Sequence, residues 1–289
     1  MHPHGRTRHP PRQVACQDAC GKENVVAMTI RRAAVAGLFY PDQPQELESM
    51  IAACLKHGIV QTTLQVPKAL IVPHAGYVYS GPVAASAYTR LPPLRERVRR
   101  VVLLGPAHRV AFQGIAASSA DAFETPLGLV EIDREVLSQA LTLPGVRILD
   151  RAHTDEHSLE VQLPFLQTVL REFRLVPLLV GDASPEAVDR MIEVLWDGDE
   201  TLLLVSSDLS HYLPYEEARQ LDQETTGAIE RLDPQKIRYD QACGRLPVQG
   251  LLLAARRHGL RVTTLDLRNS GDTAGPRDSV VGYGSYALA

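Results

Sequence analysis

The sequence predicts a single α/β domain over residues 28–289, built on a mostly parallel, doubly wound sheet with helices on both faces. Three observations predict this fold. Short apolar runs recur along the chain, as strands buried on both faces require. Helical patterns of about 10–15 residues alternate with these runs, which is typical of parallel sheets. No stretch between them is long or polar enough to divide the chain into two domains.

The strands follow from the apolar runs. Ala69-Leu-Ile-Val72 is short, apolar and partly β-branched, and Pro73 ends it. We expect two shorter strands, at 112–118 and 127–132, to form an antiparallel ribbon. This ribbon would lie over the functional site expected at the carboxyl ends of the parallel strands. The other predicted strands cover residues 98–105, 175–180, 201–206, 262–267 and 279–288.

The helices follow from apolar periodicity and end signals. Leu47, Ile51 and Leu55 recur at every fourth position of the first helix, and Asp133 can cap a later one. Pro82 suits the first position of a helix, and Pro164 marks a first turn or a kink. The predicted helices cover residues 43–57, 82–90, 133–141, 185–196, 215–230, 234–239 and 247–258.

Composition and charge predict a disordered amino-terminal tail and indicate the cellular compartment. Residues 1–27 are rich in Pro, His and Arg and lack apolar periodicity, so we predict a disordered tail there. A formal net charge of −4 argues against nucleic acid or an acidic membrane surface as the partner. No apolar run reaches the ~18 residues that a membrane helix needs. We therefore expect a soluble, cytoplasmic protein.

Three histidines follow apolar strands in loops rich in Gly, Pro and Ser. They are His74 in Pro73-His-Ala-Gly, His108 in Gly105-Pro-Ala-His, and His211 in Ser206-Ser-Asp-Leu-Ser-His. If the strands are parallel, their carboxyl ends open at one edge of the sheet, where α/β folds bind ligands. A lone histidine is usually a solvated or satisfied core residue, but three in equivalent positions favour a common pocket. Imidazoles in such a pocket suit Zn, Cu, Fe or Ni.

Cys243 and Asp208 are the next candidates. Cys243 lies where one helix ends and another begins, near Arg245, so we expect a lowered thiol pKa and a role as metal ligand or nucleophile. The alternative is a small buried apolar residue, which describes Cys54 better. Asp208 precedes His211 by three residues and could orient that imidazole, or cap the following helix.

His157 and Glu160 stand three residues apart in Asp155-Glu-His-Ser-Leu-Glu160 and could share one helical face. We predict a polar-cleft role in substrate binding for this pair. Metal binding by His153 and His157 is the weaker hypothesis, because Thr154-Asp155 resembles a helix cap. The sequence holds no P-loop, no G-x-G-x-x-G after a strand and no G-x-S-x-G, which argues against nucleotide-binding and α/β-hydrolase functions.

These motifs together resemble the Memo family (mediator of ErbB2-driven cell motility), including its prokaryotic members named AmmeMemoRadiSam system protein B. The resemblance covers about residues 31–289. It rests on five ordered segments: Pro73-His-Ala-Gly-Tyr77, Gly105-Pro-Ala-His108, Asp155-Glu-His-Ser-Leu-Glu160, Ser206-Ser-Asp-Leu-Ser-His211 and Cys243-Gly-Arg245. The family is similar in fold to class III extradiol dioxygenases, which bind Fe(II) through two histidines and a glutamate.

The resemblance implies a metal pocket with iron or copper, zinc being the further option, and redox chemistry. His74 and His108 match the two histidine ligands, and Cys243 looks like the replacement for the carboxylate. His211 falls at the acid/base position, with Asp208 beside it. The thiolate argues against dioxygenase activity itself, since it changes the charge and redox properties of the site.

Two other functions fit the same residues. One is a metal-free hydrolase or transferase with Cys243 as nucleophile and His211 as its base. The other is a non-catalytic module whose pocket recognises a peptide or a protein encoded alongside it. A peptide or small molecule is the ligand that we expect. The family name also implies an AMMECR-like protein and a radical SAM enzyme as partners.

Overall fold

The computed structural model describes residues 13–17, 23–59 and 65–289. The disordered tail predicted for residues 1–27 lies largely outside this part of the chain. Within it, strands β1 (Gln13–Gln17) and β2 (Glu23–Ala27) pair antiparallel. None of the helices in the described ranges combines the length and apolar character needed to cross a bilayer.

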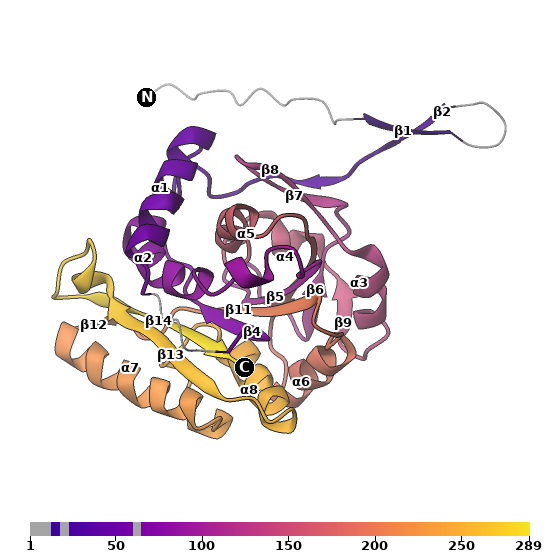
Figure 1. Cartoon of the computed structure of the whole chain (residues 1–289). Coiled ribbons are helices and arrows are strands. Elements are labelled where there is room, and N and C mark those ends of the chain that lie inside the picture. Colours follow the sequence, from indigo (N-terminus) through magenta and orange to yellow (C-terminus); the bar gives the residue numbers. More distant parts are fainter. Residues whose placement is uncertain (1–12, 18–22, 60–64) are drawn as a thin grey trace.

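A large mixed sheet forms the centre of the domain (Figure 1). Its middle consists of four parallel strands in the order β4-β11-β5-β10. Antiparallel partners flank this core, β14 beside β4 and β6 beside β10. The strands of the sheet are β4 (Ala69–Val72), β5 (Arg100–Pro106), β6 (Ile115–Ala117), β9 (Val146–Ile148), β10 (Arg174–Val180), β11 (Thr201–Ser206), β12 (His211–Leu213), β13 (Val262–Asn269) and β14 (Val280–Leu288). The predicted α/β domain is confirmed, but the sheet is mixed: β6 and β14 run antiparallel to the central strands beside them, and β9 at one edge pairs parallel with β6.

Helices cover both faces of the sheet. Figure 1 shows α1, α2 and α5 on one side and α7 and α8 on the other. The helices are α1 (Pro44–His57), α2 (Tyr77–Tyr88), α3 (Arg134–Ala140), α4 (Asp150–Thr154), α5 (Leu163–Val169), α6 (Pro185–Val194), α7 (Tyr215–Glu230) and α8 (Arg245–Arg257). The central strands are buried on both faces, so their continuous apolar runs fit this layering.

The two segments predicted to form an antiparallel ribbon do not pair with each other. The segment expected as a strand at 112–118 contributes only β6, which joins the main sheet against β10. The strand expected at 127–132 is β8 (Gly128–Glu131), and it pairs with β7 (Ala122–Thr125) in a small sheet with β3 (Ile30–Arg31). Sequence reasoning missed β7 because the turn-like Glu124-Thr-Pro lies at its end.

Three helix predictions differ from the structure. α2 begins at Tyr77, behind the N-cap Gly76, so Pro82 lies inside the helix and not at its first position. The helix expected at 234–239 is a single 3-10 turn, Pro234–Lys236. α8 begins at Arg245, two residues before Pro247. This earlier start places Cys243 directly before the helix cap Gly244.

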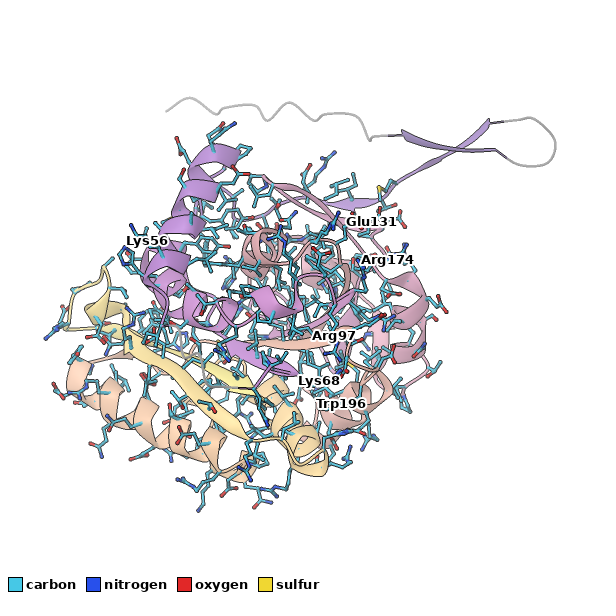
Figure 2. The ribbon with its side chains drawn as sticks, viewed as in Figure 1. Lys56, Lys68, Arg97, Glu131, Arg174 and Trp196 are labelled. Atoms are coloured by element: carbon cyan, nitrogen blue, oxygen red, sulfur yellow. The ribbon has the colours of Figure 1, made fainter. Side chains whose placement is uncertain are left out.

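At the amino end of the sheet, Lys68 ties β4 to the turn before β11. Its ammonium donates to the carbonyls of Asp197, Gly198 and Thr201 at 2.6, 2.7 and 2.8 Å. It also lies over the Trp196 ring, 5.3 Å from the centroid (Figure 2). These contacts fix the amino ends of two central strands, so their carboxyl ends are held side by side at the opposite edge.

Candidate metal centre

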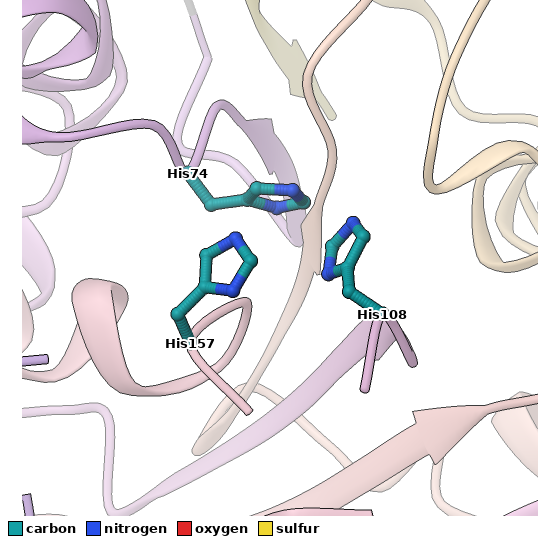
Figure 3. A group of neighbouring side chains, drawn as sticks. All are labelled: His74, His108 and His157. Atoms are coloured by element: carbon teal, nitrogen blue, oxygen red, sulfur yellow. The ribbon is translucent and has the colours of Figure 1, made fainter. Parts of the chain in front are cut away.

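Three imidazoles converge at the carboxyl edge of the sheet. His74 follows β4 and His108 follows β5, while His157 comes from the loop after α4 (Figure 3). Their ring centroids lie 5.2 Å (His74–His108), 5.4 Å (His74–His157) and 4.7 Å (His108–His157) apart. One ligand nitrogen of each lies within 4.8 Å of the others, so the group could hold a metal ion.

The hydrogen bonds of Ser206 fix the tautomer of His74. The Ser206 hydroxyl donates its only proton to the Ser158 carbonyl at 2.6 Å, and it accepts from the Gln162 amide at 2.8 Å. His74 Nδ1, 2.9 Å from the same oxygen, must therefore be the donor. Nε2 of His74 consequently carries the lone pair that metal ligation requires.

Glu156 orients His108 in the same way. Its Oε1 lies 2.9 Å from His108 Nδ1, so Nδ1 carries the proton and Nε2 keeps its lone pair. The carboxylate is buried and accepts from the amides of His108, His157 and Ser158. Burial disfavours its charge, but the bonds from His108 and Ser158 outweigh this and hold the pKa of Glu156 well below its usual range. The site thus contains an ionised carboxylate at any ordinary pH.

His157 lies in a loop, and not on a helix as the spacing predicted. α4 ends at Thr154, and the next element, a 3-10 turn, begins at Glu160. The His157 ring packs against Phe39 with centroids 4.7 Å apart, and its Nδ1 lies 3.3 Å from Glu156 Oε1 without forming a hydrogen bond. Burial lowers the pKa of His157 to about 4, and it also lowers the pKa of His74 well below its usual range. Both rings are therefore neutral, as metal ligands must be.

The loop that carries His157 packs closely against strand β5 at this edge. A Cβ on Gly105, in β5, would lie 2.8 Å from Leu159 Cδ2 and 2.9 Å from Ser158 Oγ. Any residue other than glycine would require these side chains to shift, because real Cβ atoms do not approach so closely. The strand that presents His108 is thus packed directly against the loop that presents His157.

Cys243 borders the three histidines. Its Sγ lies 3.2 Å from His74 Nε2, and the Asp208 amide donates to it at 3.3 Å. Since Nε2 of His74 bears no proton, the thiol donates in the Cys243–His74 contact. Gly244 permits this position, because a Cβ there would lie 2.6 Å from Ser207 Cβ. The expected lowering of the thiol pKa is wrong: burial, and then the nearby Asp208, raise the pKa of Cys243.

Asp208 and His211 do not form the expected pair. Asp208 Oδ1 accepts from the His74 amide at 2.7 Å, so the carboxyl holds the loop that carries His74. Burial raises the pKa of Asp208 to about 7. His211 Nδ1 instead lies 2.8 Å from the Leu209 carbonyl, which fixes the proton on Nδ1. Both residues line the histidine cavity, and their catalytic roles stay predictions.

Comparison with known proteins places this arrangement in a family. The family model described as Memo-like protein matches residues 31–287. The chain belongs to the Memo family. A MEMO1 family protein of Aquifex aeolicus is 39% identical over 89% of this chain and 98% of its own length. One from Methanosarcina barkeri is 37% identical over 90% of this chain and 100% of its own length. A solved structure of an uncharacterized protein from Escherichia coli K12 has a TM-score of 0.47 at 14% identity over 77% of this chain and 100% of its own, a likeness too distant to bear on function.

In this Memo family chain, Glu160 lies in the interior, and the substrate-binding role expected for it stays a prediction. It is fully buried, with 0% of its side chain exposed, and pairs with Arg31. It also accepts from the Ala34 amide at 2.8 Å and the Tyr40 hydroxyl at 2.6 Å. Arg31 donates to the His153 carbonyl at 2.9 Å. The structure therefore gives Glu160 a place in a network that fastens the amino-terminal segment to the loop of His157.

Sequence reasoning missed two contributors to the site. The sequence predicts a substrate-binding role for His157, whereas its ring belongs to the group of three imidazoles that could hold a metal ion. Glu156 was not singled out, although it bonds to one imidazole and three backbone amides of the site. The available signal was the adjacency of a carboxylate and a histidine in Asp155-Glu-His157, which suits a ligand beside its hydrogen-bonding support.

The site opens into two adjoining cavities. One, of about 560 Å³, is bordered by the three histidines, His211 and Asp208. The other, of about 980 Å³, is bordered by His108, His211 and Cys243. Tyr212, which borders both cavities, has a left-handed backbone with φ of 60°. That conformation is uncommon for a residue other than glycine and is characteristic of functional sites.

The donor set fits a metal ion. His74 and His108 present unprotonated Nε2 atoms, and His157 retains a buried Nδ1 without a hydrogen-bond partner. A carboxylate supports one imidazole, as in many protein metal sites. Three imidazoles, with a thiol at their margin, suit Zn, Cu or Fe.

Proposed function

We propose that this chain binds one iron or copper ion through His74, His108 and Cys243, with His157 as an additional ligand, and that it acts as an oxidoreductase. The observation that carries the proposal is the convergence of three imidazoles within 4.8 Å, two of them held in the ligand tautomer by Ser206 and Glu156. Imidazole and thiolate together favour Cu, Fe or Zn over Mg or Ca. A bound iron or copper ion would supply one-electron chemistry.

Cys243 supports the choice of a redox metal. Its sulfur, 3.2 Å from His74 Nε2, is close enough to share a metal with that imidazole after a small shift. Thiolate ligation favours soft ions such as copper, zinc and iron, and of these copper and iron are redox-active. Deprotonation would free Nε2 from the thiol hydrogen bond at the same time, so thiolate formation and imidazole ligation support each other.

His211 is proposed as the proton donor or acceptor. Its Nδ1 proton is held by the Leu209 carbonyl, which leaves Nε2 as the exchanging nitrogen. Burial lowers the pKa of His211, so the neutral ring is a base at neutral pH. The ring borders both cavities, where a ligand could reach it from either side.

The metal-free nucleophile is less well supported. An activated cysteine needs a base within hydrogen-bond reach and a lowered pKa. The imidazole in contact with Cys243 is His74, not His211, and burial raises the thiol pKa. These two findings oppose a Cys243–His211 pair.

A binding module is the second candidate function, and exposed apolar side chains favour it. Tyr239 (88% exposed) and Tyr212 (76%) border the cavities, and Leu38 (79%) neighbours the Phe39 that borders one of them. Such side chains gather at protein interaction sites. We retain the AMMECR-like protein and radical SAM enzyme as partners proposed from the family resemblance. Copurification with them, kept when His74 and His108 are both changed to Ala, would favour this function.

Anaerobic reconstitution tests the metal proposal. We expect the protein to retain about one equivalent of Fe(II) or Cu after gel filtration, and the double variant His74→Ala/His108→Ala to retain far less. His57→Ala is the matched control, because this exposed histidine at the end of α1 lies outside the site. Equal retention by the double variant and the control would refute the proposal.

A further inference from the structure

We propose that the cavity of about 560 Å³ is a binding site for a small carboxylic acid with a planar apolar body, and that Arg109 binds its carboxylate. This inference rests on the proposed function, since the metal site forms one wall of the cavity. The volume lies within the range of about 300–1,000 Å³ that is usual for small-molecule sites.

Arg109 is the cationic side chain of this cavity. Among the described residues that border it there is no lysine and no other arginine. Arg109 is exposed, and within the described part of the chain its guanidinium forms no ion pair or hydrogen bond. Its charge acts on the neighbouring His157. A guanidinium with its donors unused next to a cavity is suited to bidentate recognition of a carboxylate.

The remaining walls favour a planar apolar body. Four aromatic side chains border the cavity, from four separate segments of the chain: Phe39, Tyr79, Tyr212 and Tyr283. Tyr283 is buried at 2% exposure, and Phe39 is held against the His157 ring, so these two walls are fixed. Tyr79 and Tyr212, 40% and 76% exposed, lie at the mouth. Aromatic walls bind flat ligands through offset or edge contacts.

The charged side chains around the cavity indicate a ligand with a single negative charge. Among the described residues that border the cavity there is one carboxyl, that of Asp208, and its Oδ1 already accepts from the His74 amide. One guanidinium matches one carboxylate, whereas a phosphate dianion would require a second cation and would face Asp208 as well. A ligand anchored at Arg109 would lie near the histidines, because His74, His108 and His157 border the same cavity.

The test compares benzoate with benzamide, its neutral isostere, by calorimetry on both the metal-free and the metal-loaded protein. We expect benzoate to bind about 10- to 100-fold more tightly, as a charge-assisted pair predicts. Arg109→Gln should remove this preference, and Arg109→Lys should retain part of it. The matched control is Arg245→Gln in the adjoining cavity, which should leave the preference unchanged.

The outcomes separate this inference from the metal proposal. Equal binding of benzoate and benzamide to the unsubstituted protein, or a preference that survives Arg109→Gln, would overturn the carboxylate site. Tighter binding of phenyl phosphate than of benzoate would overturn it as well. Metal content is measured on the same samples, so a protein that binds benzoate selectively but takes up no metal would refute only the metal proposal.

Discussion

Metal binding should release about one proton, and that proton should come from Cys243. The thiol donates to His74 Nε2 across 3.2 Å, and burial beside Asp208 raises its pKa, so the metal-free protein holds a neutral thiol. A thiolate ligand must lose this proton. His74 and His157 are already neutral, because burial lowers the pKa of each, and they contribute no proton of their own.

The number of protons released depends on the titratable groups next to Cys243. Asp208, with a pKa of about 7, is roughly nine-tenths ionised at about pH 8, so it adds only about 0.1 proton there. The expected release at about pH 8 is therefore close to one proton per metal ion. The apparent affinity should rise about tenfold for each unit of pH while the thiol remains protonated. For Cys243→Ser, the release should fall to about 0.1 proton and the affinity should be almost independent of pH.

The assay is calorimetric titration with Zn²⁺ or Co²⁺ in buffers of different ionisation enthalpy, which yields the number of protons released. Cys54→Ser is the matched control. Cys54 is a buried free cysteine in α1, outside both cavities that border the histidines, and its thiol pKa is raised to about 11 by burial. The reasoning is refuted if the unsubstituted protein binds metal without releasing a proton, or if Cys243→Ser releases as many protons as the control.

Three further predictions concern the surroundings of the site. Glu156→Gln should weaken metal binding about 10- to 100-fold, because the carboxylate supports His108, and chelator competition measures this. Removing Arg31 from its buried pair with Glu160, as Arg31→Met, should lower the free energy of unfolding by about 3–5 kcal/mol in urea titrations. Arg32→Ala, which breaks an exposed pair, should cost less than about 1 kcal/mol. His153, 2% exposed, has a pKa lowered from 6.5 to about 4 by burial. Its neutral form therefore stabilises the fold fully above pH 6.5, and about 3 kcal/mol of this is lost as the pH falls to about 4. His153→Gln should lack this component of acid sensitivity in denaturation measured across that pH range.

Each of these predictions has a contradicting result. Unchanged chelator competition in Glu156→Gln would mean that the carboxylate does not support the ligand. Equal losses of stability in Arg31→Met and Arg32→Ala would mean that breaking the buried Arg31–Glu160 pair costs no more than breaking an exposed pair. Parallel stability profiles of the unsubstituted protein and His153→Gln between pH 7 and 4 would exclude a titration of this residue.

The centre of the fold could be predicted because its signals are local. Ala69–Val72 and Thr201–Ser206 are continuous apolar runs, and the structure has strands with those bounds. The antiparallel edges could not be predicted in this way. The direction of β14 beside β4 depends on the hairpin with β13 and on α7 packed beneath it, contacts that no local pattern contains.

The convergence of His74 and His108 could be predicted for a physical reason. Parallel neighbouring strands end at one edge, so residues just beyond them meet. This argument does not apply to His157, because it follows α4, a helix, and its place at the edge depends on tertiary contacts of its loop, such as the packing against Gly105. For Cys243, the nearby helix amino terminus predicts a lowered thiol pKa. In the folded chain, burial and the neighbouring Asp208 raise the thiol pKa instead.

X-ray absorption spectroscopy on the anaerobically Fe(II)-loaded protein tests the central claim most directly, because it counts the nitrogen and sulfur ligands of the ion. The account predicts two or three imidazole nitrogens at roughly 2.0–2.2 Å and one sulfur at roughly 2.3 Å, with the sulfur lost in Cys243→Ser. A first shell without sulfur or imidazole in the unsubstituted protein, or a protein that binds no iron under these conditions and no copper either, would contradict it.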